Sequence, residues 1–398
     1  MQIRALGVDE LEATRDLTAR AFGYIPDARW ETAKRRSRAA AEAGRLLGGF
    51  EGDRLVASAR IIDFTQWWHG RPVSMGGMSG VMVAPEDRGR GAGRQLMTAA
   101  LDHCAAFGHV ISALFPATTP LYRSLGWEHA GAQHWVELPT EGLRTIASGG
   151  RSGPVGRGEA EPVPLRRAGP DDAAEVVGTI RRLHAAALDS GPLDLGEEYT
   201  RSSLEDDQTY CYLAADGVLD YRWADGNDAY EVNTLVAGSE RTLRALWAIV
   251  GSGSSMVTTV RASVAPDDPV LWLTRERSSE QLRREQWMLR VVDAPGAIAA
   301  RGFPAGVSAE VPLSIDDPLR PGNSGGRLLT VSEGRGRLTA AGEDPAAVRL
   351  GACGLSALYA GVRATTLRRA GLLTGGTPAA DELLTAAFAA TPFMYDYF

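Results

Sequence analysis

The chain has 398 residues, of which 44% are apolar and 23% charged, and its formal net charge is −7. This is the composition of a globular protein with room for roughly two or three domains, and it excludes a largely disordered chain. The negative charge gives no electrostatic support to nucleic-acid binding, so no nucleic-acid partner is expected.

Few signals bear on the compartment. The three cysteines, Cys104, Cys211 and Cys353, are far apart and odd in number, which suits a reducing environment better than a disulfide framework. The first ten residues reach Asp9 and Glu10 before any apolar stretch forms, and no apolar run approaches the length of about 18 residues that spans a membrane. We therefore expect a cytoplasmic protein with no membrane partner.

Two stretches of the chain follow the same plan, the first starting at Ile3 and the second at Leu165. Each begins with a short strand, an acidic helix start and a helix, followed by a hairpin with an acidic residue and a glycine in its turn. A strand then precedes a second helix, expected over 93–107 in the first copy and 241–250 in the second. Four elements in the same order predict a duplicated α/β domain.

The remaining sequence predicts a linker and a third unit. Residues from about 139 to 164 are rich in Gly, Pro, Ser and Arg, which is typical of an exposed loop. A third unit is expected from about Gln286, with a strand over 287–292, a short helix over 294–300 and a further strand around 328–331. The expected domains are therefore 1–140, 164–285 and 286–398, with a linker over 141–163.

The last six residues contain five apolar or aromatic side chains. A chain end that hangs in water is normally polar and frayed. The composition of this segment therefore predicts that it docks against the rest of the protein.

The most informative segment joins an expected strand at Val81–Val83 to the helix predicted over 93–107. Its glycines let backbone N–H groups turn inward at a helix N-terminus, which is typical of a pyrophosphate site. A Walker loop needs Gly-Lys-Ser/Thr, which is missing, and a dinucleotide fingerprint needs a third glycine where Leu96 stands. A glycine-rich turn with solvated arginines is the structural alternative.

A third pattern, Arg-x-x-Gly-x-Gly after a Val-x-Val-x-Pro strand, is filled by Val81, Val83, Pro85, Arg88, Gly91 and Gly93. It resembles the acetyl-CoA loop of the GCN5-related N-acetyltransferases. The resemblance implies direct transfer of acetyl from acetyl-CoA to an amine, without a metal. It implies that acetyl-CoA is held by Val81, Met82, Val83, Arg88, Gly89, Arg90, Gly91, Ala92, Gly93, Arg94, Ala117 and Thr118.

A second segment strengthens the resemblance. After an expected strand over 110–115, the run Leu121-Tyr122-Arg123-Ser124-Leu125-Gly126-Trp127 is similar to the Tyr-x-x-x-Gly-aromatic segment of that family. The resemblance implies that Tyr122 lies on a short helix and protonates the leaving thiolate; the alternative is a tyrosine that only packs. The second copy, over 236–243, lacks the paired glycines and the proline, so we expect it to keep the fold without the cofactor.

Two such domains followed by a third resemble the Eis family, named for enhanced intracellular survival, over nearly the whole chain. The run from Trp287 to Phe303 looks like the start of its sterol-carrier-like domain. The resemblance implies a mixed α/β (α+β) fold with tandem acetyltransferase domains followed by a sterol-carrier-protein-like domain, and a homo-oligomer, namely a hexamer. It also implies that the terminal carboxylate of Phe398 reaches the first active site and acts as the base, directly or through water.

The implied substrate is a primary amine of a small molecule, or a lysine- or polyamine-like compound. The pocket of that family has acidic and aromatic walls, and the candidate lining residues here are Phe22, Tyr24, Asp27, Trp30 and Tyr397. Tyr397 stands where relatives that modify aminoglycosides carry an acid, and Tyr24 stands where an acid would help to hold a polyamine. These two departures favour a less cationic or more aromatic amine. Helix packing is the alternative for Phe22 and Trp30.

Other signals suggest no further chemistry. Gly322–Gly326 matches Gly-x-Ser-x-Gly, but prolines precede it and a strand-like segment follows, so a loop is expected. The six histidines form no recognisable metal pair. The competing function is a non-catalytic acyl-CoA- or lipid-binding carrier or regulatory protein. An enzyme would release CoA thiol in the presence of an amine, whereas a carrier would release none.

Overall fold

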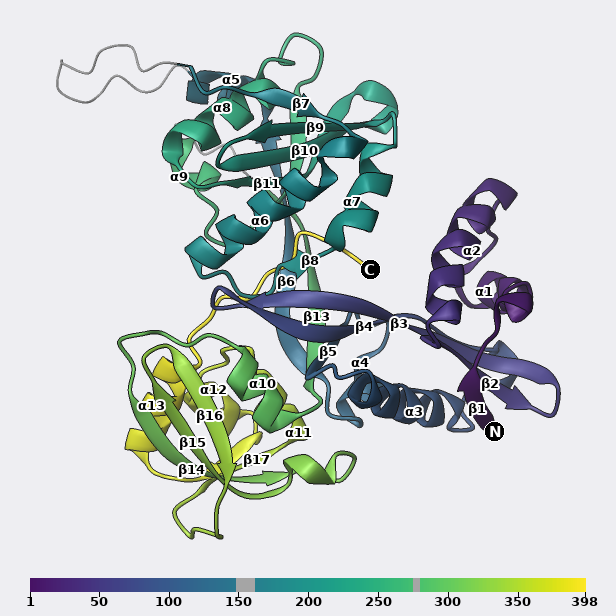
Figure 1. Ribbon diagram of the computed structural model, residues 1–398, viewed down its shortest axis with the longest axis vertical. Coiled ribbons are helices and arrows are strands. Elements are labelled where there is room, and N and C mark those ends of the chain that lie inside the picture. The colour runs from purple at the N-terminus through teal and green to yellow at the C-terminus, as the bar shows by residue number, and fades with distance from the viewer. Residues whose placement is uncertain (148–161, 275–279) are drawn as a thin grey trace.

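The computed structural model describes residues 1–147, 162–274 and 280–398. They form the mixed α/β fold that the sequence predicts, built on one 13-stranded sheet and one five-stranded sheet. Three units follow one another (Figure 1): a first unit (residues 1–139), a second unit (140–274) and a third unit (292–398), with one long strand between the last two.

The first unit begins with a strand, a 3-10 turn and two helices, which lead into a hairpin and then into strands that alternate with helices. Its elements are β1 (Gln2–Ala5), η1 (Val8–Glu10), α1 (Ala13–Phe22), α2 (Asp27–Glu42), β2 (Leu46–Glu51), β3 (Arg54–Trp68), β4 (Arg71–Val83), η2 (Pro85–Asp87), α3 (Ala92–Ala106), β5 (Ile111–Leu114), α4 (Thr119–Arg123) and β6 (Glu128–Pro139).

The second unit repeats this plan, as predicted. Its elements are α5 (Thr140–Ala147), β7 (Arg166–Ala168), η3 (Pro170–Asp172), α6 (Ala173–Ala187), β8 (Leu193–Asp194), α7 (Gly196–Leu204), β9 (Thr209–Ala214), β10 (Gly217–Ala224), η4 (Asp225–Asn227), β11 (Ala229–Ala237), α8 (Glu240–Gly251), β12 (Thr259–Val264) and α9 (Val270–Leu273). Helix α5 occupies the start of the segment expected as a linker, and residues 148–161 of that segment lie outside the described residues.

Strand β13 (Glu280–Val291) leads into the third unit, which carries the five-stranded sheet. The elements of the third unit are α10 (Ala294–Ala300), β14 (Ala309–Asp316), η5 (Pro321–Asn323), β15 (Gly325–Ser332), β16 (Arg335–Ala340), β17 (Val348–Gly351), α11 (Ala352–Tyr359), α12 (Ala364–Arg369), β18 (Leu373–Gly375) and α13 (Pro378–Ala387).

Two long strands, β6 and β13, lie in the middle of the large sheet. The strand order there is β4-β5-β13-β6-β12-β11, so β13 pairs with β5 of the first unit and β6 pairs with β12 of the second. β6 and β13 also pair with each other, antiparallel, along most of their length. The first and second units therefore share one continuous hydrogen-bond ladder and leave no open edge where they meet.

The position of β13 bears on the expected domain boundary at residue 286. The strand predicted over 287–292 is present, but it pairs in the large sheet and not in the sheet of the third unit, whose order is β16-β15-β14-β17-β18. We therefore propose that the third unit begins after Val291.

Apolar packing explains why the helices form where the sequence predicts them. Helix α3 buries Leu96, Met97, Ala100, Leu101 and Cys104 against the first unit's sheet, at helical spacing. A second core is continuous between units, because Trp68 and Met75 of the first unit join Leu355, Leu358 and Tyr359 of the third. Each large side chain buried in this way contributes about 1.5–3 kcal/mol, so the third unit is firmly attached to the first.

The chain end is docked, as its composition predicts. The yellow tail leaves the third unit and runs between the first and second units (Figure 1). The Phe393 N–H donates to the Ser190 carbonyl at 3.1 Å, and the Tyr395 carbonyl accepts from Gln133 at 2.5 Å and from the Ser263 hydroxyl at 3.2 Å. Phe393, Met394 and Tyr395 are buried.

Among the described residues, none of the helices combines the length and the apolar character that crossing a membrane requires.

Gly191 makes room for this tail, and its substitution provides a test. Its φ is +106°, and a Cβ built on it would overlap the backbone of Phe393. Gly191→Ala should therefore destabilise the protein by about 1–3 kcal/mol more than Gly196→Ala, because it adds a clash to the backbone strain. Gly196 is the matched control, since its φ is +77° and nothing lies within 4 Å of its Cβ position. Calorimetric unfolding of both variants checks this, and equal losses would contradict the described tail position.

Candidate active site

The predicted loop joins β4 to α3 and exposes a helix N-terminus. Gly89 and Gly91 have φ of +75° and +83°, a conformation that favours glycine, and a Cβ on either would meet nothing within 4 Å. Gly91 is the N-cap of α3 and offers no side chain to cap the N–H groups of the first helical turn. Residues 88–91 are exposed to solvent, so the loop suits an anion such as pyrophosphate.

An ion pair that the sequence did not reveal anchors this loop, and its arginine is about half exposed. Arg54 on β3 donates to both oxygens of Asp87, at 2.6 and 3.0 Å, and Asp87 is buried. The hydrogen bonds from Arg54 hold the pKa of the Asp87 carboxyl below its usual range. The two residues lie 33 positions apart, on a strand and a 3-10 turn, so no local pattern connects them.

The three loop arginines take different positions. Arg88 and Arg90 are exposed beside the loop, and the guanidinium of Arg90 lies 3.5 Å from Asp87. Arg94 instead donates to the hydroxyl of Ser124 at 2.7 Å, which ties the start of α3 to the turn after α4. Of the three, Arg94 is thus engaged with protein groups away from the loop.

The sheet opens next to the loop. In the described structure β4 pairs with β5 only from Met75 to Gly77, although β4 continues to Val83. The register between β3 and β4 shifts near Gly80, whose φ is +58°. Beyond Gly77 the β5 side of β4, including Val81–Val83, makes no strand pairing, so its backbone groups can bind a ligand's amide or carbonyl.

Tyr122 lies on the short helix α4, as predicted, and is only 5% exposed. Its ring meets the Trp127 ring edge-on at 6.5 Å between centroids. Burial raises the pKa of the Tyr122 phenol, and the neighbouring Tyr397 phenol raises it further. Tyr122 therefore stays protonated at neutral pH and can serve as a proton donor. Ala117 and Thr118 precede it, with Thr118 at the N-cap of α4.

The docked tail ends at this opening. The Phe398 ring packs edge-on against Phe64 and Phe115, at 5.1 and 5.6 Å between centroids. A Cβ on Gly77 would lie 2.9 Å from the Phe398 ring, so the ring lies over the last residue that pairs β4 with β5. Tyr397 lies over Phe115 at 4.4 Å and is 62% exposed. The structure thus brings Tyr122, Tyr397 and Phe398 together.

The other predicted lining residues lie on α1, on α2 and, for Tyr24, in the segment that joins them. Phe22 and Tyr24 are 60% and 82% exposed, whereas Trp30 is 4% exposed and its indole N–H donates to Glu12 at 3.4 Å. Trp30 thus packs between the helices, and Asp27 pairs with Arg15.

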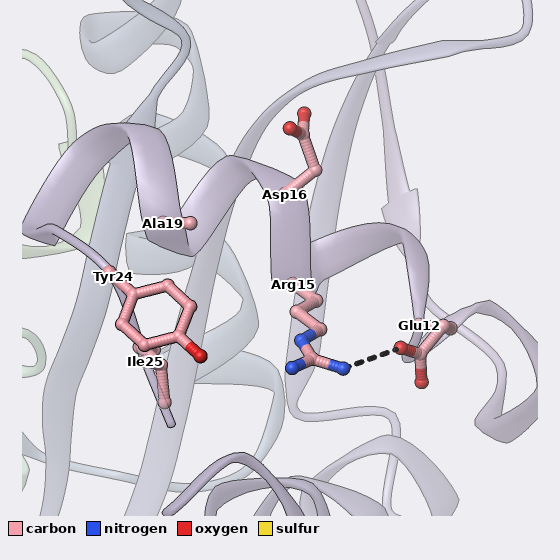
Figure 2. Close-up of a pocket in the computed structure, with 6 residues that line it drawn as sticks. All are labelled: Glu12, Arg15, Asp16, Ala19, Tyr24 and Ile25. Atoms are coloured by element: carbon pink, nitrogen blue, oxygen red, sulfur yellow. Dashed lines mark ion pairs between the residues drawn. The ribbon is translucent and has the colours of Figure 1, made fainter. Parts of the chain in front are cut away.

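A surface hollow of about 380 Å³ lies on this outer face of α1. Figure 2 shows the residues that line it: Glu12, Arg15, Asp16, Ala19, Tyr24 and Ile25. None of them belongs to the loop, to α4 or to the tail, so the hollow is separate from the opening beside Tyr122.

A group of acids surrounds the tail and was not recognised in the sequence. Asp396 faces Asp220 of β10, which accepts a hydrogen bond from Asn233 at 3.0 Å. Asp268 and Asp189 lie near the buried Tyr395, and His184 bonds to Asp189 at 2.7 Å. Burial raises the pKa of Asp396 to about 7 and that of Asp268 to about 6.

Among the described residues of the second unit, the helix that corresponds to α3 offers no equivalent anion site. The N-cap of its helix α8 is Ser239, whose hydroxyl accepts the Thr242 N–H at 3.2 Å. The Thr242 hydroxyl in turn bonds to the Asp216 carboxylate. A capped helix start beside an acid repels phosphate, which supports the expectation that this copy keeps the fold without the cofactor. Within the described residues, no group of three or more His, Cys, Asp or Glu side chains is placed to hold a metal.

Comparisons with known proteins agree with this geometry. Residues 2–130 and 195–291 each match an acetyltransferase (GNAT) domain, and residues 294–395 match a sterol carrier protein domain. An uncharacterized N-acetyltransferase from Streptomyces griseus is 29% identical over 352 residues, which is 81% of each chain.

Solved structures show the same fold. The GCN5-related N-acetyltransferase from Kribbella flavida is 43% identical over 100% of this chain and 98% of its own, with a TM-score of 0.93. The GCN5-related N-acetyltransferase from Anabaena variabilis and Eis1 from Mycobacterium abscessus are each 24% identical over both full lengths, with TM-scores of 0.85 and 0.77.

The fold and its open helix N-terminus are those of an enzyme that transfers an acetyl group from acetyl-CoA, the co-substrate of GNAT domains. The chain belongs to the GCN5-related N-acetyltransferases. The predicted order of two acetyltransferase domains and a sterol-carrier-like domain is confirmed, and so is the prediction of an N-acetyltransferase.

The raised pKa of Asp396 leads to a prediction about stability and pH. Between about pH 4 and pH 7 the folded protein holds a proton on Asp396 that the unfolded chain releases. Folding stability should therefore fall as pH rises through this window, by at most about 1.4 kcal/mol per pH unit for this group. In Asp396→Asn the stability should fall less as pH rises, so at pH 8 the Tm of the variant should be higher than that of wild type.

Thermal unfolding between pH 5 and pH 8 measures this difference. Asp53→Asn, at an exposed hairpin turn, is the matched control and should keep the wild-type slope. An unchanged slope in Asp396→Asn would contradict a buried, protonated Asp396.

Proposed function

We propose that this protein is an Eis-type N-acetyltransferase in which Tyr122 is the general acid and the α-carboxylate of Phe398 is the base. The observation that carries the proposal is the position of the Phe398 ring over Gly77, where β4 and β5 part, with Tyr397 beside Tyr122. Two groups with complementary proton-transfer roles therefore flank the opening in the sheet.

The chain supplies three parts of the reaction. The loop from Arg88 to Arg94, with the N-terminus of α3, binds the pyrophosphate of acetyl-CoA and fixes its position. Backbone groups of Val81–Val83, which no strand pairs on the β5 side, hold the thioester carbonyl and stabilise the negative charge that develops on its oxygen. Tyr122 protonates the thiolate as it leaves, and its buried phenol is in the required protonated state.

The base must remove a proton from the amine. A carboxylate at the end of a chain ordinarily has a pKa near 3.5, far below that of an alkylammonium. Where Phe398 ends the chain, its ring packs against Phe64 and Phe115 beside the opening, and a carboxylate beside apolar groups is a stronger base than one in water. The carboxylate then takes the proton directly or through a water molecule.

The acceptor is a primary amine of a small molecule or of a lysine- or polyamine-like compound. Phe115 and Tyr397 give the opening an aromatic wall. This environment favours an aromatic or weakly cationic amine over a polycation. Phe22 at the end of α1 and Tyr24 just after it are both exposed and remain candidates for the outer wall. By its likeness to the Eis family we also propose a homo-oligomer, a hexamer.

Tyr122→Phe tests the general acid. The variant keeps the ring that packs on Trp127 and loses only the phenol oxygen, so kcat should fall about 10²-fold with little change in the affinity for acetyl-CoA. Release of CoA thiol in the presence of an amine panel measures kcat. Tyr210→Phe in the second unit is the matched control and should retain wild-type turnover. A Tyr122→Phe enzyme with wild-type kcat would remove the general-acid role.

Extension of the chain tests the base. One alanine added after Phe398 moves the α-carboxylate away from its position at the opening, so kcat should fall by at least about 10-fold while the Tm stays close to wild type. Phe398→Ala keeps a terminal carboxylate and loses the ring that packs on Phe64 and Phe115, so it measures how much of any loss comes from the packing of the chain end. Turnover that survives the extension would show that the carboxylate takes no part in the chemistry.

A further inference from the structure

We propose that Arg290, Asp317 and Ser356 are positioning residues for Tyr122, so that the sterol-carrier-like unit forms the rear wall of the acetyltransferase site. The inference rests on the proposed role of Tyr122 and extends it to residues that lie more than 160 positions away in sequence.

The need for such a wall follows from the shape of the Tyr122 segment. Helix α4 has five residues, and the carbonyl groups at the end of a helix have no partners within it. Local backbone bonds satisfy the Tyr122 carbonyl, which accepts from the N–H groups of Leu125 and Trp127 at 3.0 and 3.1 Å. The carbonyls of Leu125 and Gly126 point to groups from elsewhere in the chain.

Those groups come from β13 and from the third unit. The Arg290 Nε–H donates to the Leu125 carbonyl at 3.0 Å, and the Ser356 hydroxyl donates to the Gly126 carbonyl at 3.0 Å. Helix α11, which carries Ser356, also places Cys353 Sγ 3.2 Å from the Arg123 carbonyl. Donors from outside the first unit therefore hold three successive parts of the turn that follows Tyr122.

Arg290 is itself held rigidly. It is fully buried, and its guanidinium forms an ion pair with Asp317 at 2.5 Å and donates to the Val291 carbonyl at 2.9 Å. Asp317 also accepts from the Asn323 side chain at 2.9 Å. Because all three nitrogens of this planar guanidinium donate hydrogen bonds, the group has one orientation and holds the Leu125 carbonyl in one place.

Gly126 shows how closely the two surfaces fit. Its φ is +91°, and a Cβ there would lie 2.7 Å from both Arg290 Nε and the Cβ of Ala352. The glycine of the Tyr-x-x-x-Gly segment thus allows the backbone of the Tyr122 turn to approach Arg290 and α11. Since a misplacement of about 1 Å at a catalytic group can cost about 10²-fold in rate, this contact bears directly on turnover.

Ser356→Ala is the main test, because it removes the hydroxyl that donates to the Gly126 carbonyl and accepts from the Val291 N–H, and it leaves the buried ion pair intact. The expected result is a fall in kcat of about 3- to 10-fold with an unchanged KM for acetyl-CoA. Ser356→Thr, which keeps the hydroxyl, should restore kcat, and Ser314→Ala, a partly buried serine of β14 in the same unit, should have no effect. Arg290→Lys keeps the charge but loses the planar guanidinium that bonds to three partners, so it should lower kcat more than Ser356→Ala does.

A double-mutant cycle with Tyr122→Phe separates positioning from general destabilisation. If Ser356 acts through Tyr122, Ser356→Ala should cause no further loss of kcat in the Tyr122→Phe enzyme. An equal fractional loss in both backgrounds would overturn the proposal.

A spectroscopic readout separates this proposal from the proposed function. The ¹⁹F resonance of 3-fluorotyrosine at position 122 should shift or broaden in Ser356→Ala and Arg290→Lys, and stay unchanged in Ser314→Ala. A shifted resonance with wild-type kcat would support the positioning and contradict the acid role of Tyr122. An unchanged resonance in both variants would overturn the positioning while the acid role stands on Tyr122→Phe alone.

Discussion

The backbone ladder between β6 and β13 is the constraint on which the rest of the structure depends. β13 lies between β5 and β6, and β6 lies between β13 and β12. Each of the two strands therefore pairs with a strand that is distant from it in the sequence. The sheet of the first unit continues only through β13, which follows the second unit, and the sheet of the second unit continues only through β6 of the first. This explains why a second copy that lacks an anion site still contributes to the fold, because it pairs with the strand that follows the Tyr122 segment.

Local chemistry made much of the fold predictable from the sequence. Helices α3 and α10, the turn between β2 and β3 and the strand at 328–331 follow from apolar spacing, glycines and prolines within a few residues. The partner of β13 could not be predicted in this way. Its residues 287–292 read as a strand in either position, and only long-range packing selects the large sheet.

The features of the candidate site also fall into those that local sequence predicts and those that depend on long-range contacts. The loop glycines, Tyr122 and the docked tail could be found because each is a short pattern or a local excess of one residue type. Arg54–Asp87, Arg290–Asp317 and Asp220–Asp396 could not, since the members of each pair lie on different elements and an isolated Arg or Asp resembles any surface charge. Local sequence also gave no sign that Arg94 turns to Ser124 or that Trp30 is buried between helices.

The place of β13 in the chain sets an order for synthesis. The strand that lies beside β5 is made only after the whole second unit, so an emerging first unit has an unpaired β5 edge for about 150 residues of translation, several seconds at ordinary elongation rates. Until then an edge rich in buried apolar side chains, such as Ile111 and Leu114, is open to pairing with another nascent chain. The duplicated architecture therefore leaves this edge of the first unit uncovered until β13 has been made.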